Sequence, residues 1–155
     1  MNMEILNTRI PPWDIERLGK DEVPDYEKLK GKPLLILFFY LGCPGCTGRA
    51  IPFANKMAYE YTDKINIIGI HSNFEGPEYN DDDIVEKLKS LYVRFPVFKD
   101  SGLASTFYKY QAAGTPHWIL VNREGNVIRT IFGSDPNRAL LRLDYALTEE
   151  ISTID

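Results

Sequence analysis

A buried strand that runs directly into two cysteines and then into a helix is the feature that most limits how this chain can fold. Residues 33–41 are almost continuously apolar, over the length of a strand covered on both faces. Residues 50–61 repeat apolar side chains at the spacing of an amphipathic helix. Cys43 and Cys46 lie between these segments. This order predicts a strand–turn–helix unit, with both thiols at the start of a helix that runs from about residue 44 to 62.

That position favours a reactive thiol at Cys43. The start of a helix offers unpaired backbone N–H groups and the positive end of the helix dipole, and both stabilise a thiolate. In Cys-X-X-Cys pairs of this kind the pKa of the first thiol falls to about 3.5–7.5. Thiolate is the form that attacks disulfides, so the pattern predicts dithiol–disulfide exchange.

Two other uses of the cysteines are weaker. The pair encloses only two residues, so a disulfide would remove little entropy from the unfolded chain. Zinc would need two further ligands, and His71 and His117 stand at no recognised spacing from the pair. We therefore rank zinc below redox chemistry, and expect no metal and no cofactor.

The composition limits the class of protein. A chain of 155 residues that is 44% hydrophobic can form one domain with a core, so we expect a single domain over residues 1–155. The net charge of -4 argues against a nucleic-acid partner. No apolar run is long enough to span a membrane, and no signal peptide is visible. We expect a cytoplasmic protein; an exported protein trimmed of its leader would look the same. Oligomeric state is not indicated.

The other segments predict an α/β protein. The strand at 65–70 should pair parallel to the first strand through a right-handed βαβ connection. The further expected elements are an irregular N-terminal extension over 1–24, a helix over 25–30, a helical insert at about 81–93 capped by Asp82 or Asp83, a strand near 95–98, a helix over 103–110, a hairpin of 118–121 and 127–132, and a last helix opened by Asp135. This mixture indicates a central sheet with helices on both faces.

The same order, with Thr115 and Pro116 placed just before the hairpin, resembles the thioredoxin-like superfamily. Within it the chain is most similar to the TlpA/ResA-type thiol–disulfide oxidoreductases. The matching segments are residues 31–33, 43–46, 95–100, 110–116 and 119–125, together with the insert. The resemblance covers roughly residues 25–150. It implies a three-layer sandwich, in which a central mixed β-sheet is flanked by helices.

The resemblance also assigns roles around the cysteines. Cys43 matches the exposed nucleophile and Cys46 the buried resolving thiol, while Pro116 matches a proline that follows a cis peptide bond. It further implies that Thr115 pairs with the substrate chain through its backbone. The partners would be a disulfide-containing protein substrate and a thiol electron donor. Pro44 and Gly45 would tune the redox potential by setting how many amide donors reach the Cys43 sulfur.

Two nearby residues have alternative interpretations. Arg49 would lower a thiol pKa if it folded inward, but a solvated helix residue is the favoured interpretation. His117 has a reference pKa suited to proton transfer, but alternation along a strand favours a side chain that points away from the cysteines. We interpret His71 as a loop histidine with no role.

The chain departs from the family pattern at three positions. Gly42 replaces a usual tryptophan, Leu37 replaces the buried carboxylate of thioredoxins, and Arg49 replaces a glutamate of the ResA type. Cys46 therefore lacks the usual acid–base partner, which argues against fast thioredoxin-like reduction. Pro52 is also shifted by one residue, and is expected to kink the first long helix.

The leading hypothesis is a thiol–disulfide oxidoreductase, acting as a reductase if the protein is cytoplasmic. A peroxiredoxin-like thiol peroxidase using Cys43 is the first alternative, and Tyr40 counts against it because peroxiredoxins carry threonine there. A copper-binding redox module of the Sco type is the second. That family uses a wider cysteine spacing and a histidine, so the match is poor.

Overall fold

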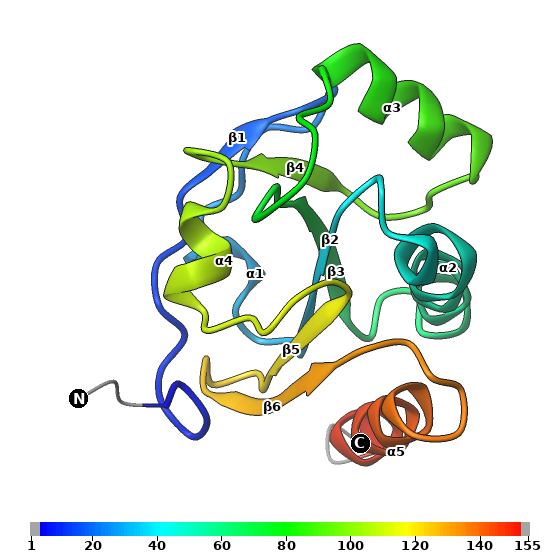
Figure 1. The fold of residues 1–155 in the computed structure, drawn as a ribbon. Coiled ribbons are helices and arrows are strands. Elements are labelled where there is room, and N and C mark those ends of the chain that lie inside the picture. The colour runs from blue at the N-terminus through cyan, green and yellow to red at the C-terminus, as the bar shows by residue number, and fades with distance from the viewer. Residues whose placement is uncertain (1–3, 153–155) are drawn as a thin grey trace.

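The computed structural model describes residues 4–152, and a mixed β-sheet lies at their centre. Its strands follow the order β1-β4-β3-β2-β5-β6 (Figure 1). Neighbours among β2, β3 and β4 run parallel, and the other adjacent pairs are antiparallel. The strand bounds are β1 Ile15–Arg17, β2 Leu34–Phe39, β3 Asn66–His71, β4 Val97–Asp100, β5 His117–Val121 and β6 Val127–Phe132. The expected parallel βαβ unit and the hairpin are both confirmed.

Helices cover both faces of this sheet (Figure 1). They are α1 Tyr26–Leu29, the π-helix η1 Cys46–Ala50, α2 Ile51–Glu60, α3 Asp81–Ser90, α4 Ser105–Lys109 and α5 Ala139–Ser152. Alternation along β2 sends Leu35 and Leu37 into one apolar cluster with α2 and α5. Ile36 and Phe38 enter the opposite cluster with α4 and the N-terminal segment. The expected α/β sandwich with three layers is confirmed.

Strand β2 is apolar throughout because it is central. It pairs with β3 on one side and β5 on the other, and each of its six residues is fully buried. A strand covered on both faces and both edges leaves no position for a polar side chain. The C-terminal end of this rigid strand is where the cysteine segment begins.

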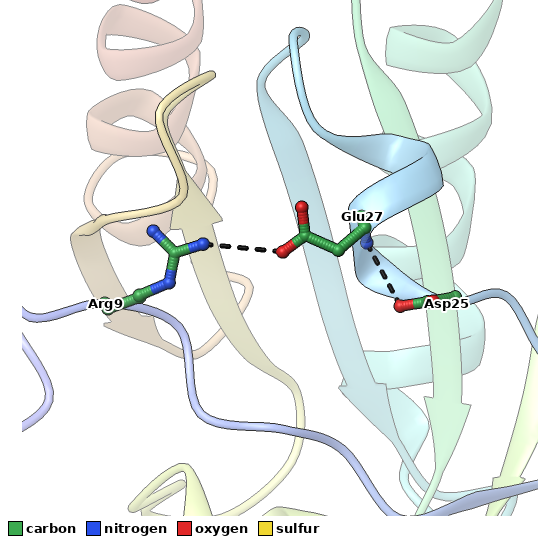
Figure 2. A network of polar contacts seen from close by, with 3 residues as sticks. All are labelled: Arg9, Asp25 and Glu27. Atoms are coloured by element: carbon green, nitrogen blue, oxygen red, sulfur yellow. Dashed lines mark hydrogen bonds and ion pairs between the residues drawn. The ribbon is translucent and has the colours of Figure 1, made fainter.

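The prediction of an irregular extension over residues 1–24 was wrong in part. Ile15–Arg17 forms β1, which adds to the sheet edge by pairing antiparallel with β4. Residue Arg9 bridges back toward α1, where its guanidinium lies 3.5 Å from Glu27 (Figure 2). Asp25 caps that helix, because its Oδ1 accepts a hydrogen bond from the Glu27 amide at 3.2 Å. The ion pair is exposed and contributes little stability, so β1 pairing is the stronger anchor.

Three features of the helices differ from expectation. The predicted single helix over 44–62 contains a π-helical segment before α2, so Pro52 falls in the first turn of α2, where a missing N–H is tolerated. Asn80, not Asp82 or Asp83, caps α3, accepting from the Asp83 amide at 2.8 Å. Asp135 instead starts a turn, and α5 begins at Ala139.

Candidate functional site

The two cysteines lie at the C-terminal end of β2, at the start of the helical run that begins at Pro44. The Cys43 amide donates to the Tyr40 carbonyl at 3.0 Å, and the Cys43 carbonyl accepts from the Cys46 and Thr47 amides. Both thiols are free. Cys43 is partly exposed and Cys46 is fully buried. The expected placement and the expected difference in exposure are therefore confirmed.

The segment before β5 closes over the pair. The peptide bond between Thr115 and Pro116 is cis, as predicted. Cys43 Sγ lies 3.4 Å from the Thr115 carbonyl oxygen and donates to it. A Cβ built on Gly45 would lie 3.8 Å from Pro116 Cδ, so the cysteine loop and Pro116 are in contact range. The exposed thiol and a backbone carbonyl thus face the same space.

Cys46 has an apolar environment. It belongs to the cluster that contains Leu37, Ala50 and Trp118, all fully buried. Burial is the main reason that the pKa of Cys46 is raised well above its ordinary value, and its hydrogen bond with Cys43 adds to the effect. A backbone hydrogen bond from Tyr40 opposes it. Leu37 occupies the position of the buried carboxylate of thioredoxins, and no carboxylate within residues 4–152 is among the groups that shift the pKa of Cys46. Burial therefore holds Cys46 as a neutral thiol.

A groove of about 730 Å³ opens beside Cys43. Residues 74–77 form one wall, and residues 113–115 with Phe132 form the other. Tyr40 also lines the groove, and its hydroxyl donates to the Pro77 carbonyl of the first wall. This ring explains Gly42, because a Cβ there would come within 2.7 Å of Tyr40 Cε2. The packing of Tyr40 thus takes up the space beside residue 42, where the family usually has tryptophan.

Comparison with known proteins gives the family. Residues 10–147 match the family described as Redoxin. The chain belongs to the Redoxin family. The comparison with curated proteins finds no match.

Solved structures agree with this assignment. A thiol-disulfide isomerase from Corynebacterium glutamicum is 27% identical, with 94% of this chain and 97% of that chain covered and a TM-score of 0.84. A thioredoxin-like superfamily protein is 26% identical, with 92% and 96% covered and a TM-score of 0.81. A Chlorobium tepidum protein proposed to be the thiol:disulfide interchange protein DsbE is 19% identical, with 96% and 99% covered and a TM-score of 0.82, and shows the fold alone. The thioredoxin-like fold and the thiol–disulfide oxidoreductase class are confirmed.

In this Redoxin protein Arg49 is not simply solvated. Its side chain is exposed, but Nε donates to the hydroxyl of Ser134 at 3.2 Å. Ser134 is buried in the segment between β6 and α5, and its Oγ would lie 3.0 Å from a Cβ on Gly45. The pair therefore packs beside the cysteine loop. Ser134 could not be identified from the sequence, because its neighbours along the chain carry no signal of contact with residues 45–49.

His117 is buried in β5, and both of its ring nitrogens have partners. Nδ1 lies 3.3 Å from the Ala113 amide, which can only donate, and Nε2 lies 2.7 Å from Thr130 Oγ1. The neutral ring therefore carries its proton on Nε2 and donates it to Thr130. Burial lowers the pKa of His117 to about 4. These contacts support the interpretation of His117 as a structural strand residue.

The interpretation of His71 as a loop histidine was wrong. It is the last residue of β3, is 3% exposed, and its Nε2 accepts from the Leu41 amide at 3.0 Å. Leu41 lies two residues before Cys43, so His71 holds the backbone that leads into the site. Its ring also contacts Phe39 and Tyr40, with centroids 5.2 and 5.7 Å apart. Parallel pairing of β2 with β3 places residue 71 beside residue 39. The expected pairing of these two strands was therefore the feature from which the position of His71 could have been predicted.

Between residues 4 and 152, no group of three or more His, Cys, Asp or Glu side chains is arranged to hold a metal ion. None of the helices in the same range is long and apolar enough to cross a membrane.

Proposed function

We propose that Cys43 is the nucleophile and Cys46 the resolving thiol of this thiol–disulfide oxidoreductase. The observation that carries the proposal is the asymmetry of the pair: one free thiol faces the groove at a helix start, and its partner is buried directly behind it. A visiting disulfide can reach only the first sulfur. The second can then react only with a sulfur already bonded to Cys43.

The exchange takes two steps. The Cys43 thiolate attacks one sulfur of the substrate disulfide, forms a mixed disulfide, and releases the other substrate sulfur as a thiolate that takes up a proton. Cys46 then loses its proton to solvent and attacks Cys43 Sγ. The Cys43–Cys46 disulfide forms and the remaining substrate sulfur leaves as a thiolate. The protein pair is oxidised by two electrons, the substrate is reduced by two, and a thiol donor restores the dithiol.

Other residues shape the space in which this happens. Thr115 offers a carbonyl oxygen within 3.4 Å of Cys43 Sγ, at the position where a substrate backbone amide can donate. Pro116 packs near Gly45, which keeps the cysteine loop and this carbonyl at a set separation. Pro44 and Gly45 leave the Cys43 carbonyl as the first acceptor of the helix. These are proposed positioning roles, with no bond made or broken.

Single-cysteine variants test the assignment. We expect Cys43→Ser to abolish reduction of insulin and of glutathione disulfide, while Cys46→Ser stops after one step and accumulates a mixed disulfide visible by mass spectrometry. Each variant keeps one thiol, so each adduct has only one possible site. A mixed disulfide on Cys46 in the Cys43→Ser variant would overturn the roles. Hydrogen peroxide consumption faster than disulfide reduction would favour a peroxidase.

A further inference from the structure

The groove beside Cys43 has two chemically different walls. Phe132 is 56% exposed, and a Cβ on Gly114 would lie 2.8 Å from its ring, so aromatic surface covers the wall formed by residues 113–115 and Phe132. Phe74 stacks on Phe107 with ring centroids 4.7 Å apart, which fixes the base of the opposite wall. Glu75, on the same wall, is exposed and lines the groove. An extended peptide placed between the walls therefore meets aromatic surface on one side and a carboxylate on the other.

Glu75 is the charged residue of this groove. Among the described lining residues there is no lysine or arginine and no second carboxylate. Within the described chain Glu75 makes no ion pair, and its charge acts on the hydroxyl of Tyr40, which also lines the groove. Lys99 does not neutralise Glu75, because it pairs with Asp81 at 2.9 Å and the other acidic charges acting on it are those of Glu16 and Glu78. The negative charge of Glu75 is thus left to be met by an incoming chain.

We propose that the groove selects disulfides in protein segments that carry a lysine or arginine and an apolar side chain next to the reacting cysteine. The apolar side chain packs against Phe132, and the basic one lies against Glu75. This inference rests on the proposed function, because the segment must present its sulfur to Cys43. Opposite charge at the rim raises the local concentration of such segments and speeds their encounter with the thiol.

Peptides activated with thionitrobenzoate measure this preference. Four peptides differ only beside the cysteine: Lys or Glu on one side, and Leu or Ser on the other. Attack by Cys43 on the cysteine sulfur releases the coloured thiolate. At low salt we expect the Lys peptide to react about tenfold faster than the Glu peptide, a ratio that falls toward one at about 1 M salt. We expect the Leu peptide to react several-fold faster than the Ser peptide, and Phe132→Ser to remove that difference.

Charge variants attribute the preference to one residue. Glu75→Gln should bring the Lys-to-Glu ratio near one, and Glu75→Lys should invert it. Glu149→Lys on α5 makes the same change in net charge outside the groove and should keep the wild-type ratio. Neutral hydroxyethyl disulfide serves as the reference substrate for all variants.

The outcomes separate the two claims. If hydroxyethyl disulfide is reduced but the wild-type ratio is near one, or Glu149→Lys changes it as much as Glu75→Lys, the selectivity inference is overturned and the oxidoreductase stands. If no disulfide reacts with Cys43, the proposed function itself fails, and the inference with it.

Discussion

Replacing His71 with phenylalanine tests whether a buried neutral imidazole holds the chain that enters the site. Phenylalanine keeps a ring against Phe39 and Tyr40 but removes the Nε2 acceptor, so the Leu41 amide loses its partner. A buried donor left without a partner costs about 1–3 kcal/mol. We expect His71→Phe to lower the free energy of unfolding at pH 7 by that amount.

The pH dependence of the same variant is the sharper test. Burial lowers the pKa of His71 from 6.5 to about 4, with nearby Lys99 adding to the shift and Asp81 opposing it. The unfolded chain therefore takes up the proton first as pH falls. The stability due to the neutral ring is fully present above about pH 6.5 and is lost as pH falls toward 4. By linkage, this residue costs the wild type about 2 kcal/mol between pH 7 and pH 5.

Urea unfolding followed by tryptophan fluorescence at both pH values measures the effect. His71→Phe has nothing to protonate at this position, so the stability gap between wild type and variant should narrow by about 2 kcal/mol from pH 7 to pH 5. Other titrating groups are shared by both proteins and cancel in the difference. His117→Phe is a parallel test, in which the stability gap should narrow in the same way, since burial also lowers the pKa of His117 to about 4. A gap for His71→Phe that does not change with pH would refute the buried neutral imidazole.

Two further variants probe the site and its support. We expect Leu37→Asp to flatten the pH dependence of mixed-disulfide resolution below pH 8, because it adds a carboxylate to the apolar cluster that contains Cys46, whose pKa is raised by burial. Leu37→Asn is equally polar but unable to take the proton, so it should leave the pH dependence unchanged. Equal pH profiles of the Asp and Asn variants would refute this. Gly76→Ala should lower the free energy of unfolding by about 1–2 kcal/mol, since φ is +87° and the new Cβ would meet Tyr40 Oη at 2.8 Å. Gly19→Ala, with nothing within 4 Å, is the neutral control, and similar urea midpoints for the two variants would contradict the argument.

Local sequence patterns were sufficient for the framework of the protein. A continuous apolar run predicted the central strand, and the three-and-four spacing after it predicted the helix, because burial on two faces and burial on one face leave different repeats. The last helix follows the same rule, because Leu143 and Leu147, four residues apart on one face, are both fully buried. The errors fell where pairing with residues far away in the sequence decides the local structure. Residues 15–17 became a strand because β4 offers them an unpaired edge.

The sequence by itself determined where the proposed reacting groups lie: two thiols separated by two residues, at the junction of a buried strand and a helix. Only the tertiary structure decided what surrounds them. The Leu41 amide donates a hydrogen bond to His71, thirty residues later in the chain, and Arg49 donates one to Ser134, eighty-five residues later. Phe132 and Glu75 come from separate segments to wall the same groove. Spacing along a chain specifies neighbours within a few residues, whereas these contacts depend on which strands pair and in what register.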